Sequence, residues 1–167
     1  MEIVPHFGGN THQPKEPKMP VKYSRRHLLW IVPVAVLAIG SVELGARMLA
    51  PPPSDLDLSL SKRTDKGLYV ATLAADQSPI PVGTLHSWTV TISTPDGQPA
   101  QIASITIDGG MPQHGHGLPT KPEVTTDLGK GAHLIEGMKF NMPGWWTLTV
   151  SIEGPSGDDA ATFNLVL

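Results

Sequence analysis

The stretch WWTLTVSI, residues 145–152, is the clearest indication of the fold of this chain because apolar and polar side chains alternate along it. One phase holds Trp, Leu, Val and Ile, whereas the other holds Trp, Thr, Thr and Ser. Successive side chains of a β-strand point to opposite faces, so this period of two predicts a strand with one face in a core. The same alternation recurs in residues 87–92 and 162–167.

Shorter candidate strands lie at residues 68–73, 103–107, 124–126 and 133–140, and turn-forming residues at 79–83, 95–97, 108–110, 128–131 and 154–157 separate the candidates. About seven short, half-buried strands predict an all-β domain, an immunoglobulin-like antiparallel β-sandwich. The side chains expected to point inward are Trp88, Val90, Ile92, Trp146, Leu148, Val150, Ile152, Phe163 and Leu165.

A second feature divides the chain. The 22-residue, mostly apolar run Leu28–Leu49 has no charged residue apart from Glu43 and Arg47, and as a helix it would be about 33 Å long. We therefore expect four parts: a basic, Pro-rich tail at 1–26, a single transmembrane helix at 27–50, a linker at 51–66 and the sandwich domain at 67–167. Residues 24–29, SRRHLL, also resemble a twin-arginine export signal, but no suitable pair of small residues marks a cleavage site near Ala50.

The charges around the apolar run predict its orientation. Five basic residues lie between Lys15 and Arg26, so the positive-inside rule places the N-terminus in the cytoplasm and the C-terminal domain in the periplasm of a bacterium, with the helix in the inner membrane. Residues 51–167 carry six basic and twelve acidic side chains, a net charge of −6. This excess of acid argues against nucleic acid as a partner and leaves the lipid bilayer and other proteins.

The composition also argues against several kinds of chemistry. The chain has no cysteine, which excludes disulfides, c-type haem attachment, iron–sulfur ligation and a cysteine nucleophile. It contains neither a Gly-x-Ser-x-Gly nor a His-Glu-x-x-His motif, and we expect a protein that is not an enzyme.

One loop holds a chemically suggestive cluster, MPQHGHG at residues 111–117. His114 and His116 are two residues apart between glycines, and Met111 and Met142 are candidate thioether ligands. Imidazole and thioether without carboxylate suit copper, particularly Cu(I), better than calcium or magnesium. His86 or His133 could add a ligand. The alternative is that the histidines belong to a polar loop or a protein contact.

Three residues are candidates for contact with partner proteins. Trp145 falls in the outward phase of its strand, where an exposed indole favours a protein interface. Glu43 and Arg47 are four residues apart in the expected helix, so they can pair near its outer end or contact a neighbouring subunit.

Two linked motifs resemble a known family. PxHGHGxxTxPxV at 112–124 and GxxFxMPGxW at 137–146 are similar to the YtkA-like domain family, a neighbour of the FixH and CopC-type proteins. The resemblance covers residues 67–167. It implies an exported, non-enzymatic, immunoglobulin-like domain on a lipid or helix anchor, of a kind often linked to copper or to the assembly of respiratory complexes.

Two functions follow as expectations. In the first, the chain is a non-catalytic accessory subunit of a photosynthetic or respiratory membrane complex, which it caps on the periplasmic side. In the second, it is a periplasmic copper-binding or copper-delivery protein that uses the His114-x-His116 loop.

Overall fold

The computed structural model describes residues 50–167. The expected tail and transmembrane helix, with Glu43 and Arg47, lie outside the described residues. Within residues 50–167 there is no helix with the length and hydrophobicity of a membrane span.

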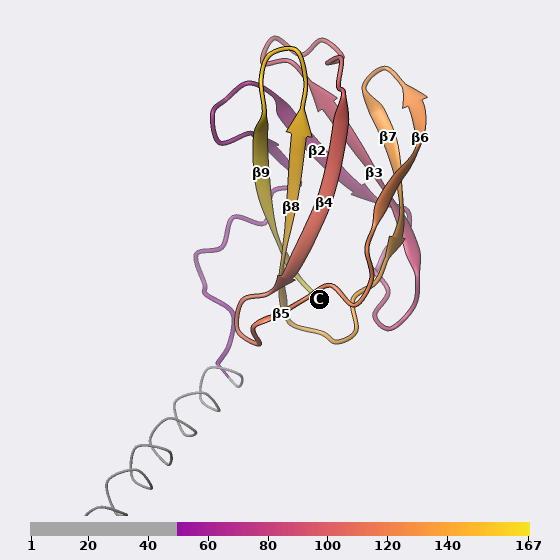
Figure 1. The fold of residues 1–167 in the computed structure, drawn as a ribbon. Coiled ribbons are helices and arrows are strands. Elements are labelled where there is room, and N and C mark those ends of the chain that lie inside the picture. The colour runs from indigo at the N-terminus through magenta and orange to yellow at the C-terminus, as the bar shows by residue number, and fades with distance from the viewer. Residues whose placement is uncertain (1–49) are drawn as a thin grey trace, which may run out of the picture. The chain divides into compact units, whose positions relative to one another are not determined.

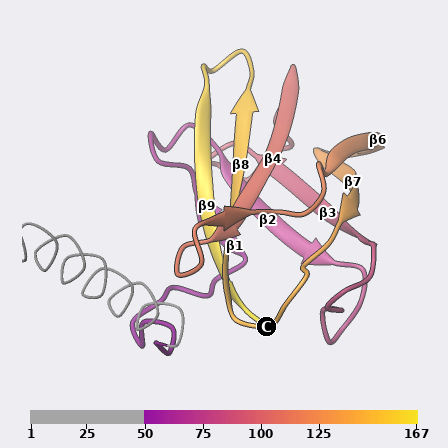
Figure 2. The ribbon, with the colours of Figure 1, turned by 60° about the horizontal axis from the view of Figure 1, so that its bottom comes forward.

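The described chain forms two antiparallel sheets that face each other (Figures 1 and 2). The five-stranded sheet has the order β1 (Ser61–Arg63), β2 (Val70–Ala75), β3 (His86–Ser93), β7 (Ala132–Met138), β6 (Glu123–Gly129). The four-stranded sheet has the order β5 (His116–Gly117), β4 (Ser104–Met111), β8 (Trp145–Glu153), β9 (Asp159–Val166). The prediction of an all-β, antiparallel sandwich is confirmed, with nine strands in this region in place of about seven.

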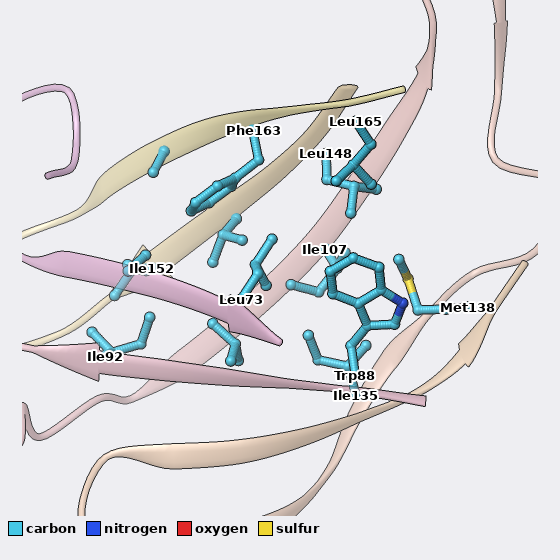
Figure 3. Packing of buried hydrophobic residues seen from close by; sticks show 14 of the residues in the cluster. Leu73, Trp88, Ile92, Ile107, Ile135, Met138, Leu148, Ile152, Phe163 and Leu165 are labelled. Atoms are coloured by element: carbon cyan, nitrogen blue, oxygen red, sulfur yellow. The ribbon is translucent and has the colours of Figure 1, made fainter. Parts of the chain in front are cut away.

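The alternating pattern correctly predicted which side chains enter the core. All nine residues expected to point inward are at most 5% exposed. Some of them lie opposite each other on neighbouring strands, for example Leu148 of β8 and Phe163 of β9. They also pack against side chains of the facing sheet (Figure 3). Each such side chain contributes about 1.5–3 kcal/mol by leaving water. Burial of one face of each strand therefore accounts for the sandwich.

The glycines at 109–110 were expected to form a turn, and this prediction was wrong. They continue β4, where Gly109 pairs with Leu148 of β8 and Gly110 pairs with Gly117 of β5. A Cβ at Gly109 would lie 2.4 Å from the carbonyl oxygen of Thr147. Glycine is needed at these positions because the neighbouring backbone approaches closely. A glycine pair in a sequence can mark either a turn or such a close approach, and the sequence does not distinguish the two.

The domain also begins earlier than residue 67. Residues 61–63 form β1, and Leu60 packs against the core. A three-residue edge strand is too short to show a period of two, so the sequence alone does not distinguish this stretch from a linker. Among the described residues, the core lies between Leu60 and Leu167, so residues 51–167 contain all of this core.

A buried carboxylate locks the start of β9 to the turn after β1. Asp159, only 6% exposed, accepts hydrogen bonds from the backbone N–H groups of Lys66 (2.9 Å), Leu68 (3.1 Å) and Ala160 (2.9 Å). Burial raises the pKa of Asp159, but the hydrogen bonds to the ionised form outweigh it and lower the pKa to about 2. The carboxylate therefore stabilises the fold in its charged form.

Candidate functional site

The histidine cluster lies at the end of the sandwich where the described chain begins. We call this the entry end and define it by Ala50, by residues 76–85, 112–122 and 139–144, and by the C-terminal residues Val166 and Leu167 (Figures 1 and 2). Backbone contacts join these segments: Gly83 donates to the carbonyl of Phe140 (2.7 Å), and Gly144 exchanges two hydrogen bonds with Leu167. The opposite end of the sandwich holds the turn between β6 and β7.

A tight turn brings the two histidines together. The N–H groups of His114 and Gly115 both donate to the carbonyl of Met111, at 3.1 and 2.9 Å, and Gly115 has a φ of 68°. This left-handed conformation favours glycine, which has no Cβ. The chain then returns as β5, with His116 opposite Met111. The ring centroids of His114 and His116 are consequently 5.9 Å apart.

The His116 ring is oriented by its neighbours. Its Nδ1 lies 3.0 Å from the carbonyl oxygen of Gly117, and its ring packs edge-on against Trp146 with centroids 5.7 Å apart. Because a carbonyl only accepts, Nδ1 carries the proton and Nε2 of the neutral ring keeps its lone pair. His116 is exposed and His114 is half-buried. This is the arrangement that lets an imidazole ligate a metal through Nε2.

The two methionines are less available than the histidines. Met111 is 1% exposed and belongs to the core, and its methyl group lies against Gly144, where a Cβ would come within 2.8 Å of it. Met142 is half-buried, and its carbonyl accepts a hydrogen bond from Trp146 Nε1 (3.1 Å). Among the described residues, no group of three or more His, Asp or Glu side chains is placed to hold a metal. The donors that the structure brings together are His114 and His116.

The other two histidines considered as ligands lie elsewhere. His86 is 5% exposed, with Nδ1 3.1 Å from the carbonyl of Thr84, and its Nε2 has no hydrogen-bond partner among the described residues. A row of rings, His116–Trp146–Phe140–His86, separates it from the loop, with successive centroids 5.7, 5.2 and 5.5 Å apart. His133 lies on β7 opposite Asp127, beside the turn at the other end. Neither shares a site with His114 and His116.

The burial of His86 was detectable from the pattern of its strand. His86 shares the phase of Trp88 and Val90, the inward phase of residues 87–92. Extending the alternation by one residue, from Ser87 to His86, places the ring in the core.

The segment that enters the sandwich is bound to it at several points that the sequence did not reveal. Gln113, in the histidine loop, donates through Nε2 to the carbonyls of Ala50 (2.9 Å) and Pro51 (3.1 Å). Further along, Asn164 Nδ2 donates to the carbonyl of Asp57 (3.1 Å), whose carboxylate pairs with Lys62 at 2.9 Å. The expected linker is therefore held against the domain over most of its length.

Trp145, expected to contact a partner protein, already has a contact within the chain. Its side chain is half-buried and its Nε1 donates to Oδ1 of Asn164 (3.1 Å), the residue that holds Asp57. The outward phase of Trp145 is as expected, but its indole N–H holds Asn164, which in turn binds the entering segment.

A family model described as YtkA-like matches residues 66–151, just over half of the chain, and this range includes the histidine loop and both sequence motifs. No curated protein and no solved structure matches the chain.

Proposed function

Because the chain belongs to the YtkA-like family, we propose that it is an exported, non-catalytic accessory subunit of a bacterial membrane complex, photosynthetic or respiratory, that caps the complex on its periplasmic side. In this proposal residues 27–50 cross the inner membrane with the N-terminus in the cytoplasm, and the sandwich lies in the periplasm.

The attachment of the entering segment to the sandwich carries this proposal. A mobile carrier works best on a free tether, whose reach grows with the number of unbound residues. Here the hydrogen bonds of Gln113 to Ala50 and Pro51, and of Asn164 to Asp57, leave few residues free between position 50 and β1. Such a short, bound connection favours a domain held in one place relative to its anchor, as a structural subunit requires.

A subunit of this kind gains from contacts at several levels. The cytoplasmic tail, the helix face with Glu43 and Arg47, and the sandwich would each raise the effective concentration of the next contact. The complete layout, rather than the sandwich alone, would then determine the strength of association.

The test is purification of the full chain from its native membrane in mild detergent. We expect the wild-type protein to co-purify stoichiometrically with a large complex, and a variant lacking residues 1–20 to associate more weakly while its sandwich stays folded. Gln113→Ala, which releases residues 50–51, should also weaken association, whereas Gln101→Ala at the opposite end should not. A chain that runs as a monomer and tolerates loss of its tail would contradict the proposal.

A second candidate function is copper binding or delivery, and the orientation of His116 favours it. With Nδ1 engaged by the Gly117 carbonyl, Nε2 of His116 is available to a metal ion, and His114 is the neighbouring imidazole. Imidazoles in an exposed loop without a carboxylate cluster suit copper. Met111 would add a thioether only if it left its packing position in the core.

Copper binding is tested by competition against a chromophoric Cu(I) chelator with the full chain in detergent. We expect His114→Ala/His116→Ala to lose affinity and His133→Ala, the control, to keep it. Because the His116 ring packs against Trp146, bound copper should also quench tryptophan emission in the wild type and in the control. Equal affinities in the double variant and the wild type would reject the site.

A further inference from the structure

The loop between β2 and β3 presents apolar side chains to solvent although it is held firmly. From residue 77 to residue 85 it reads QSPIPVGTL, without a charged residue. Its Ile80 packs against the core, and its backbone is joined to Phe140 through the neighbouring residues Val82 and Gly83. Even so, Leu85 is 65% exposed and Val82 is 39% exposed. The loop therefore exposes apolar side chains from a backbone that is held in place by the rest of the domain.

The exposed apolar residues gather at the entry end. Of the five large exposed hydrophobic residues in the described chain, Val82, Leu85 and Val166 lie there. Leu58 belongs to the entering segment, and Leu128 lies near the end of β6, beside the turn at the opposite end. Figure 1 shows that the loop between β2 and β3 and the chain near residue 50 lie at the same end of the two sheets.

Charge is also unequal between the two ends. The three loops of the entry end carry one acidic and two basic side chains, a net charge of +1, in addition to His114 and His116. The turns at the opposite end, residues 64–69, 94–103, 127–131 and 153–159, carry six acidic and two basic side chains, a net charge of −4. The charged residues of the entry loops are Asp76, Lys121 and Lys139. The entering segment adds Asp55 and Asp57, of which Asp57 is paired with Lys62 at 2.9 Å. An anionic surface would therefore repel the opposite end more strongly than the entry end.

We propose that the entry end rests on an anionic phospholipid bilayer, with Leu85 and Val82 inserted among the head groups. The proposal rests on the membrane anchor of the proposed function and goes beyond it by naming the surface that the sandwich touches. The chain before residue 50 is the apolar run Leu28–Leu49, so a bilayer is the surface that the anchor would bring to this end. Two apolar side chains bind a membrane weakly by themselves, but an anchored domain needs only weak binding to adopt one orientation.

The absence of cysteine from the sequence makes a direct test possible. Leu85→Cys and Leu128→Cys place single thiols at two exposed leucine positions at opposite ends, 65% and 53% exposed in the wild type. Both variants of the full chain are labelled with an environment-sensitive fluorophore and reconstituted in phosphatidylcholine–phosphatidylglycerol liposomes without any other protein. The quencher is a nitroxide attached to the lipid head group.

We expect the label at position 85 to shift its emission to the blue and to lose intensity with the quenching lipid, and the label at position 128 to do neither. Equal responses at both positions would overturn the proposal. It would also be overturned if position 85 responds only when the native complex is present, because the occupant would then be a protein. The proposed function fails separately, if the protein runs as a monomer in mild detergent while position 85 is still quenched in pure lipid.

Discussion

Replacement of Asp159 by asparagine is the perturbation whose effect the structure defines best. Both oxygens of the wild-type carboxylate accept hydrogen bonds from backbone N–H groups. Oδ1 accepts from Lys66 and Ala160, and Oδ2 accepts from Lys66 and Leu68. In Asp159→Asn the amide oxygen can replace only one of these acceptors. The amide NH₂ group then faces a donor, so at least one buried N–H loses its partner and the negative charge is lost.

The expected loss follows from the pKa of Asp159. A pKa of about 2 in the fold, against the ordinary value of 3.8, corresponds to about 2 kcal/mol of stability at neutral pH. Because the folded pKa lies below the unfolded one, this contribution is complete above about pH 5 and disappears as the pH falls through about 4 to about 2. The variant should therefore be less stable by about 2 kcal/mol at pH 7, and this deficit should shrink toward pH 2.

Urea unfolding of residues 51–167, followed by tryptophan fluorescence between pH 7 and pH 2.5, measures this difference. Trp88 and Trp146 are fully buried and report loss of the core. Asp158→Asn, at the exposed neighbouring position, is the control and should match the wild type at every pH. A deficit that stays constant with pH would show that the charge of Asp159 does not stabilise the fold, and no deficit at pH 7 would refute the hydrogen-bonded lock altogether.

Three further predictions concern packing and topology. Leu148→Ala should destabilise residues 51–167 by about 2–5 kcal/mol in urea unfolding, because the side chain is 1% exposed and leaves a cavity; a change below about 0.5 kcal/mol would contradict its place in the core. Gly109→Ala should cost about 1–3 kcal/mol by the same measurement, since its Cβ would lie 2.4 Å from the Thr147 carbonyl oxygen, whereas Gly117→Ala, with its nearest contact at 3.4 Å, should be tolerated. Protease added to spheroplasts should digest the sandwich and spare the tail, and a protected sandwich would reverse the proposed orientation.

The sequence predicted which histidines form the candidate site, but it did not predict whether Met111 takes part or how the His116 ring is oriented. The motif at 111–117 identified His114 and His116, and the structure places their rings 5.9 Å apart. It did not show that Met111 belongs to the core, because a methionine is equally compatible with packing and with ligation. Nor did it show the hydrogen bond from His116 Nδ1 to the Gly117 carbonyl, which depends on the turn at Gly115.

The buried face of each long strand follows from the pattern of residues alone. Alternation is a local property: a strand sends neighbouring side chains to opposite faces, so the apolar phase of residues 145–152 must enter a core wherever that core lies. The same reasoning holds for residues 87–92 and 162–167, and it was sufficient to predict an all-β antiparallel sandwich.

The contacts at the ends of the sandwich, in contrast, are visible only in the three-dimensional structure. The contact of Gln113 with Ala50 joins residues 63 positions apart, and the contact of Asp159 with Lys66 joins residues 93 positions apart. The close approach of Gly109 to the Thr147 backbone is likewise a contact between two strands. Such pairings depend on how strands are ordered within the sheets, and no spacing within a single stretch of sequence carries that information.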